Sequence, residues 1–297
     1  MKETFIVDKP KRIDKLLAER FIAHSRNYFQ YLIEMGCITC NGRKIKKREI
    51  PAVGDEIQIV FVDLPEIDLK PEEIPLEILY EDEAIICINK PAGMVVHPAP
   101  GHHSGTFVNA LLYYCKSLPM EENRPGIVHR LDKETSGVLL AAKTLETHKK
   151  LIEAFSNRHI HKEYLAIVVG NPANQTIEAP IGRHPIKRKE MAISETGRSA
   201  TTHIELLTST KGFSLIKATP ITGRTHQIRV HLRHIKAPIL GDLVYGPSKL
   251  SEKLGAKRQL LHAHFLRFSH PITKKIMTIT APIPDDLQKW IDELSKI

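Results

Sequence analysis

The sequence predicts an α+β protein, with a small N-terminal module ahead of a larger domain built on a largely antiparallel sheet. The chain has 297 residues, of which 42% are hydrophobic. That composition is enough for a packed core in one large domain or in two. Beyond about residue 84, strand-like segments outnumber helical ones and occur in runs, instead of alternating with helices one by one. This order is typical of α+β folds.

Residues 12–60 predict the small module. Apolar residues recur at helical spacing in residues 13–17 and 29–33. Gly36 is suited to end the second helix, because glycine adopts the left-handed conformation without strain. Residues 38–45 predict two short strands around an Asn-Gly turn.

An acidic segment separates this module from the rest of the chain. Residues 63–83 hold nine acidic residues, one lysine and three prolines. Proline stiffens a chain and like charges extend it, so we interpret the segment as a linker. The expected domains are therefore residues 1–62 and 84–297.

Residues 84–297 predict the sheet and two clear helices. The helices are expected at residues 145–158 and 284–297, where apolar residues follow a helical period. The predicted strands are 84–89, 138–142, 164–169, 201–207, 213–219, 260–267 and 276–281.

The positive charge of the chain is concentrated in the small module. The net charge is +9, and residues 9–48 alone hold 11 Lys or Arg against 3 Asp or Glu. A clustered basic surface attracts polyanions, with an affinity that falls as salt rises. A merely solvated basic surface is the alternative.

Several functional classes have no support in the sequence. No apolar run is long enough to span a bilayer, and the N-terminal residues lack the apolar stretch of a signal peptide. Cys37 and Cys40 form a C-x-x-C without a second pair, and the 16 His residues show no ligand pattern. We therefore expect a soluble, cytoplasmic protein with reduced thiols, no bound metal and no membrane partner.

Residues 129–137 read His-Arg-Leu-Asp-Lys-Glu-Thr-Ser-Gly, and Asp132 is the strongest candidate for chemistry. Cations such as Arg130 and Lys133 can keep a neighbouring carboxylate charged and orient it. An oriented carboxylate can act as a nucleophile or as a base. A lone Asp is more often a helix cap or part of a surface salt bridge.

This nine-residue string resembles the active-site motif of the RluA-type pseudouridine synthases, in which the Asp is the catalytic residue. The resemblance implies a catalytic domain with a largely antiparallel mixed sheet. Further segments resemble the same family: residues 89–98 (NKPAGMVVHP), 161–164 (HKEY) and 222–231 (TGRTHQIRVH), together with 239–246 and 261–264, which we expect to carry structure.

The resemblance also implies roles for individual residues. Tyr164 would lie against the target base, and Arg229 would form an ion pair with Asp132. Arg130 would lie near the flipped nucleotide and fill the gap left in the stack. Tyr164 could instead be a core tyrosine. The segment that contains Arg229 could instead be a helix with a basic solvent face, although Gly223 argues against a plain amphipathic helix.

The small module resembles the S4 RNA-binding domain. The resemblance rests on an Asn-Gly turn followed by basic residues and then by Val-Gly-Asp-Glu-Ile. It implies that the following residues contact structured RNA: Arg12, Lys15, Ser25, Arg26, Arg43 and Lys44.

Together these resemblances imply an enzyme that isomerises uridine to pseudouridine in RNA. The combination of the two domains is most similar to the type D synthases of large-subunit (23S) ribosomal RNA. The expected partner is therefore this ribosomal RNA or its precursor, and not DNA. The bond from ribose C1′ moves from N1 to C5 of the base, which requires no cofactor. The uridine must leave the stack to expose these atoms.

The sequence leaves the route and two alternative functions open. Asp132 could attack C1′, attack C6 of the base, or remove a proton to give a glycal intermediate. A non-catalytic RNA-binding or ribosome-assembly factor would have no need of the set Asp132, Tyr164 and Arg229. An N-glycosidase could use the same carboxylate but would release free uracil.

Overall fold

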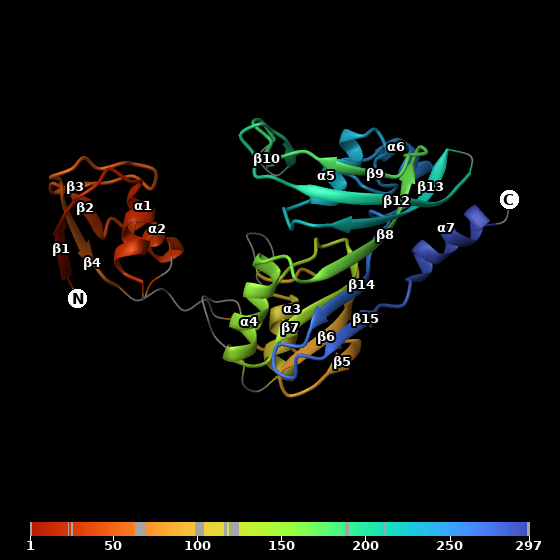
Figure 1. The fold of residues 1–297 in the computed structure, drawn as a ribbon, viewed down its shortest axis with the longest axis horizontal. Coiled ribbons are helices and arrows are strands. Elements are labelled where there is room, and N and C mark those ends of the chain that lie inside the picture. Colours follow the sequence, from red (N-terminus) through yellow and green to blue (C-terminus); the bar gives the residue numbers. More distant parts are fainter. Residues whose placement is uncertain are drawn as a thin grey trace. The chain divides into compact units, whose positions relative to one another are not determined.

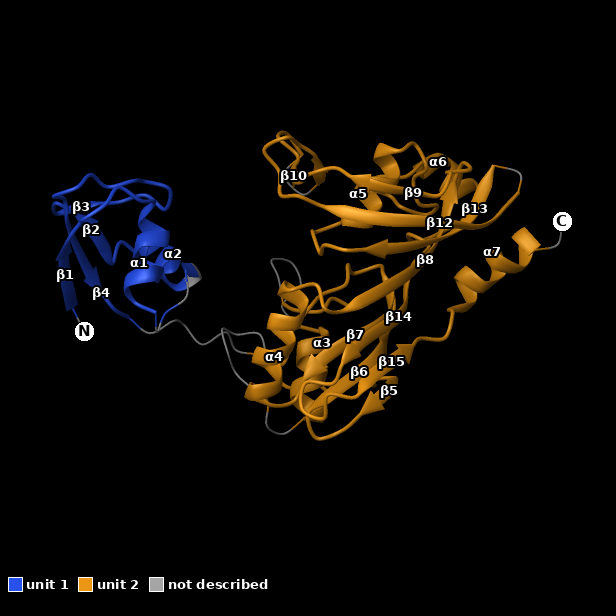
Figure 2. Cartoon of the chain, in the orientation of Figure 1, with its two compact units in different colours: residues 1–68 blue, residues 69–297 orange. Residues whose placement is uncertain are grey.

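The computed structural model contains two units, residues 1–68 and 69–297 (Figure 2). Each unit has its own apolar core. The structure describes residues 2–22, 24, 26–62, 69–98, 104–115, 118, 125–187, 190–210 and 212–295.

The N-terminal unit combines two short helices with an antiparallel sheet in the order β1-β4-β2-β3. Helices and sheet share a core that includes Leu17, Phe29 and Ile57. Asn41 and Gly42 have φ values of 49° and 74°, as a two-residue hairpin turn requires. Both helices and this hairpin were predicted, whereas β1 was not. The elements are β1 (Lys2–Ile6), α1 (Ile13–Arg20), α2 (Arg26–Glu34), β2 (Ile38–Cys40), β3 (Arg43–Lys44) and β4 (Glu56–Val60).

The second unit is built on one large sheet, as Figure 1 shows. Its strand order in the described residues is β5-β6-β7-β14-β8-β13-β12-β9, with β15 paired to β14. Only β7 and β14 run parallel among these pairs, so the largely antiparallel sheet is confirmed. The strands are β5 (Ile78–Glu81), β6 (Ile85–Lys90), β7 (Ser136–Ala142), β8 (His161–Val169), β9 (Gln175–Glu178), β12 (Thr201–Thr210), β13 (Phe213–Pro220), β14 (Leu261–Ser269) and β15 (Ile276–Thr280).

The sheet begins earlier than the acidic composition indicated. β5 lies inside residues 63–83, which we expected to be linker, and pairs with β6. Glu81 in this strand forms an ion pair with Lys143 at 2.7 Å. A strand can carry acidic residues when partners neutralise them, so the expected linker does not extend to residue 83.

Helices cover parts of the sheet, and a two-stranded ribbon adds to one end. The predicted helix at 145–158 is α4, and the C-terminal helix is α7; the other helices were not predicted as such. No helix in the described ranges is long and apolar enough to cross a membrane. The remaining elements are α3 (Phe107–Tyr114), α4 (Leu145–Ser156), β10 (Ile181–Arg183), β11 (Met191–Ile193), α5 (Gln227–His234), α6 (Ser248–Lys253) and α7 (Asp285–Ser295).

The parallel pair β7–β14 lies directly behind the Asp132 motif. Gly137, the last residue of that motif, has a φ of 112°, and a Cβ there would lie 2.2 Å from the backbone oxygen of Ala263. Only glycine allows this approach. The end of the motif therefore serves packing, and it fixes where the preceding loop leaves the sheet.

Candidate active site

Hydrogen bonds to backbone carbonyls fix the loop that carries Asp132. Lys90 Nζ donates to the carbonyl of Lys133 at 3.1 Å, and the Gly93 backbone N–H donates to the same oxygen at 2.9 Å. Burial lowers the pKa of Lys90 to about 7. Arg258 donates to the carbonyl of Glu134 at 3.0 Å. Residues 89–98 therefore support the loop, as we expected of a structural segment.

Arg229 joins Asp132 to a second, buried carboxylate. Its Nη1 donates to Asp132 Oδ2 at 2.9 Å, which is the ion pair that the resemblance implied. Its Nε and Nη2 donate to Asp242 at 2.7 and 3.0 Å. Burial opposes the charge on Arg229, but the hydrogen bonds and charges of Asp242 and Asp132 outweigh it and raise the pKa of Arg229. The guanidinium is thus fixed as a cation in one orientation.

Asp242 is the anchor of this arrangement. Its carboxylate is fully buried and also accepts the backbone N–H groups of Val244 and Tyr245, each at 2.9 Å. Burial would raise the pKa of Asp242, but the hydrogen bonds and charge of Arg229 hold it below its ordinary value. Two carboxylates therefore share one arginine, and only Asp132 is partly exposed, at 18%.

Arg130 and Lys133 do not pair with Asp132, although both flank it in the sequence. No ion pair joins either cation to Asp132 among the residues that the structure describes, and both side chains are exposed. The cation that fixes Asp132 comes instead from α5, 97 residues further along the chain.

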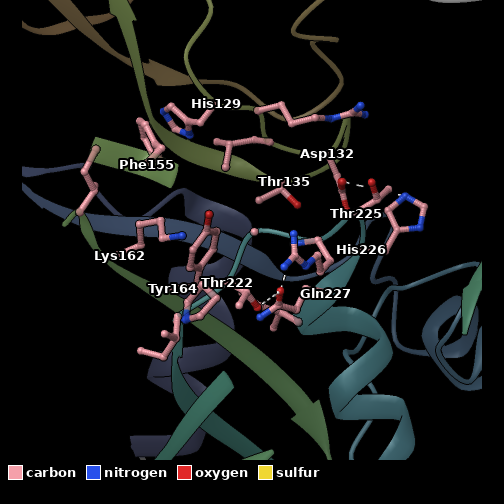
Figure 3. A pocket seen from close by; sticks show the side chains of 18 of the residues that line it. His129, Asp132, Thr135, Phe155, Lys162, Tyr164, Thr222, Thr225, His226 and Gln227 are labelled. Carbon is pink, nitrogen blue, oxygen red and sulfur yellow. Dashed lines mark hydrogen bonds and ion pairs between the residues drawn. The ribbon is translucent and has the colours of Figure 1, made fainter. Parts of the chain in front are cut away.

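His226 lies on the other side of Asp132. Its Nε2 is 3.9 Å from Asp132 Oδ1 (Figure 3). Its Nδ1 is 2.8 Å from the Tyr245 hydroxyl. That hydroxyl accepts the Met191 backbone N–H and can donate to Nδ1, which favours a proton on Nε2, facing Asp132. Burial lowers the pKa of His226, and Asp132 only partly offsets it. His226 is therefore neutral at neutral pH, and its Nε2, at 3.9 Å, is too far from Asp132 for a hydrogen bond.

A cavity of about 490 Å³ opens above Asp132. Tyr164 and Lys162 lie next to each other on one side of the cavity (Figure 3). They are two residues apart on strand β8, so their side chains point to the same face of the sheet. Burial, with the charge of Asp132, raises the pKa of Tyr164, so its hydroxyl keeps its proton at neutral pH. Burial lowers the pKa of Lys162 to about 8.

The cavity is lined by cations as well as by rings. His129 stacks on Phe155 with ring centroids 4.7 Å apart, and burial lowers the pKa of His129 to about 3. An apolar wall is thereby formed beside the charged groups. Besides Arg229, four arginines line this cavity: Arg130, Arg158, Arg198 and Arg224. Such a combination suits a base together with its phosphates.

Comparison with known proteins places this site in a family. The family described as RNA pseudouridylate synthase matches residues 84–234, which contain Asp132, Tyr164 and Arg229. The chain belongs to the RNA pseudouridylate synthase family. It is thus an enzyme that isomerises uridine in RNA to pseudouridine, and its S4 domain, matched over residues 11–57, binds RNA.

Full-length relatives share this organisation. The ribosomal large subunit pseudouridine synthase D of Xanthomonas campestris is 41% identical over 295 residues, covering 96% of this chain and 89% of the relative. An uncharacterised RNA pseudouridine synthase of Bacillus subtilis is 40% identical over 292 residues, covering 97% and 95%. Among solved structures, the human RNA pseudouridylate synthase domain containing 4 is similar with a TM-score of 0.59 and 28% identity, over 73% of this chain and 92% of that one.

Some residues of the S4 domain that we expected to contact RNA form ion pairs with acidic residues of the same domain. Arg12 and Arg26 both donate to the buried carboxylate of Asp14, at distances of 2.5–2.7 Å. Arg43 pairs with Glu49 at 2.5 Å. The predicted contact Ser25 lies outside the described residues. Lys15 and Lys44 are exposed and form no ion pair with another described residue.

Sequence reasoning missed Asp242, His226 and Tyr245 as parts of the site. Asp242 and Tyr245 lie in the matched segment 239–246, to which we gave only a structural role. One signal was present: an arginine that holds a carboxylate inside a protein requires further acceptors. The alternative reading of this segment, a helix with a basic solvent face, is not supported, because Ile228 to Leu232 of α5 are all buried.

Proposed function

We propose that this enzyme isomerises uridines of large-subunit ribosomal RNA, with Asp132 as the reacting carboxylate. The observation that carries the proposal is the chain Asp242–Arg229–Asp132, which presents one partly exposed carboxylate to a cavity lined by arginines. The substrate follows from the relatives named as synthases of the ribosomal large subunit. An enzyme of that RNA works in the cytoplasm.

The reaction requires the target uridine to leave its stack and enter the cavity. Unstacking costs a few kcal/mol. Arg130, which is exposed at the cavity, is proposed to take the place of the base, because a planar cation can stack and bind phosphate. Tyr164 is proposed to pack its ring against the uracil and to orient it through the protonated hydroxyl.

Asp132 then acts on the nucleoside in one of three ways. It attacks C1′, attacks C6 of the base, or removes a proton from the ribose to give a glycal. In each route the C1′–N1 bond breaks and a C1′–C5 bond forms. The bond that Asp132 forms in the two attack routes breaks again, and in the glycal route the ribose proton returns to C2′. The proton on C5 is lost and N1 gains one, so atoms balance without a cofactor. Arg229, which donates to Asp132 at 2.9 Å, keeps the carboxylate aimed before the reaction.

In vitro isomerisation tests this proposal. The purified enzyme is mixed with an unmodified transcript of large-subunit ribosomal RNA, and pseudouridines are mapped at nucleotide resolution. We expect new pseudouridines with the native enzyme and none with Asp132→Asn. Release of free uracil would indicate an N-glycosidase. RNA binding without either product would indicate a non-catalytic binding or assembly factor.

A further inference from the structure

A second cavity lies beside the active cavity and shares a wall with it. Its volume is about 260 Å³. It lies between the start of β8, the end of β13, and the pair β14 and β15. The residues common to both cavities are Arg158, Ile160, Lys162, Pro220 and Ile221.

The lining of the second cavity is basic and apolar. Arg158, Lys162 and Arg267 are cations there, and no Asp or Glu is among the described residues that line it. None of the three forms a hydrogen bond or ion pair with another described side chain. Lys217 on β13, by contrast, pairs with Glu205 at 2.6 Å. Apolar side chains, among them Ile160, Ile221 and Phe268, line the cavity with them. Unpaired cations beside apolar side chains suit a nucleotide, which combines phosphate with a ring.

Arg158 stands at a backbone position that normally takes glycine. It follows the end of α4 with a φ of 62°. Its N–H bonds the carbonyl of Phe155 at 3.2 Å, and the next N–H, of His159, bonds the carbonyl of Ala154 at 2.9 Å. This pair of bonds is a Schellman motif, in which the left-handed residue is usually Gly. A side chain there costs about 1–2 kcal/mol. Lys236 occupies the equivalent position after α5, also with a φ of 62°, and lines neither cavity, so the case for Arg158 rests on its place in both cavities.

We propose that Arg158 and Arg267 bind the phosphodiester beside the target uridine, and that the second cavity holds the adjoining nucleotide of the RNA. The inference rests on the proposed function, since it extends the substrate of the same site. Consecutive nucleotides share one phosphate, so a uridine in the active cavity leaves that phosphate within reach of the shared wall. Arg158 lines both cavities and so can hold it while the base is turned.

Arg158→Gly separates this role from a structural one. Relief of the left-handed conformation should raise the Tm of the protein by about 2 °C. The same change should weaken RNA binding about tenfold and lower the salt slope of binding by about one. A residue needed only for folding would give the opposite pattern, with a lower Tm and unchanged affinity.

Arg267→Gln tests the second cavity alone, because Arg267 lines that cavity and not the active one. The probe is a synthetic stem-loop that contains the mapped target uridine, with one uncharged methylphosphonate placed on either side of it. Binding is measured by fluorescence anisotropy, and isomerisation is measured separately. Lys253→Gln on α6 is the control, since it lines neither cavity.

The native enzyme should bind one of the two methylphosphonate RNAs about tenfold more weakly than it binds the unmodified RNA. Arg158→Gly and Arg267→Gln should each bind that same methylphosphonate RNA almost as well as they bind the unmodified RNA, because the phosphate contact is already missing. Equal losses in native and variant proteins, or no loss in any, would overturn the inference. If the inference is overturned in this way but the native enzyme still forms pseudouridine, the proposed function stands. Absence of isomerisation in the native enzyme would instead refute the proposed function.

Discussion

Replacing Asp242 by Asn removes the buried charge that holds Arg229, without touching the cavity itself. Asp242 accepts two hydrogen bonds from Arg229, at 2.7 and 3.0 Å, and its side chain is 0% exposed. Removal of one partner of a buried ion pair costs about 3–5 kcal/mol. Because Asp132 and one Asn oxygen still offset part of the charge, we expect a loss of about 2–3 kcal/mol.

Asp242→Asn should also lower the rate of pseudouridine formation. A guanidinium that is no longer fixed lets Asp132 move, and a misplacement of about 1 Å can cost about 100-fold in rate. The loss should appear in the single-turnover rate of pseudouridine formation at saturating RNA. RNA affinity should change far less, because Asp242 does not line the cavity.

Acid unfolding gives a second readout of the same pair. The pKa of Asp242 in the fold is below its ordinary value of 3.8, so its contribution is present above that pH and lost as pH falls through the folded value. Asp242→Asn should lack this part of the acid response. Trp290, the single tryptophan, packs on Phe213 and reports unfolding of this unit by fluorescence.

Glu205→Gln is the matched control for loss of one carboxylate. Its pair with Lys217 is exposed, so stability should change by about 0.5 kcal/mol or less and the rate should be kept. If Asp242→Asn folds and isomerises uridine at a rate close to that of the native enzyme, the buried arginine does not position the carboxylate.

Three further predictions concern the packing, His129 and the RNA surface. Gly137→Ala should lower stability by about 3 kcal/mol or more in a urea titration, because its Cβ meets backbone, whereas Gly223→Ala, which has open space, should change it little. Burial lowers the pKa of His129 to about 3, so the unfolded state binds more protons than the folded state between about pH 3 and 6.5. The free energy of unfolding should therefore fall as pH decreases through that range, and His129→Gln should flatten this slope. An unchanged slope would show that His129 is not the group responsible. Lys15→Gln and Lys44→Gln should each lower the salt slope of RNA binding by about one, and unchanged slopes would mean that these exposed lysines are not phosphate contacts.

Much of the sheet could be predicted because its strands carry their burial in the local sequence. The run Ser136–Ala142 is buried at every position, and β8 has a continuous buried stretch. The Asn-Gly hairpin was equally local. β5 could not be predicted in this way, since its acidic residues are compensated by a lysine 62 residues away. Strand β1 pairs with β4, which lies more than fifty residues further on.

The same distinction holds for the site. Asp132 and Arg229 were found because both lie in strings that resemble known motifs. Asp242 was not assigned a role, because its importance comes from a pair of bonds that only the folded chain brings together. Arg158 was not noticed at all, since its sequence context gives no indication of a left-handed backbone.

The most direct test of the account is isomerisation by Asp132→Asn, measured beside RNA binding on the same unmodified large-subunit transcript. Asn keeps the size of the side chain but removes the charge that Arg229 holds. The account predicts that this variant still binds the RNA and forms no pseudouridine. Pseudouridine formed at a rate comparable to that of the native enzyme would contradict it.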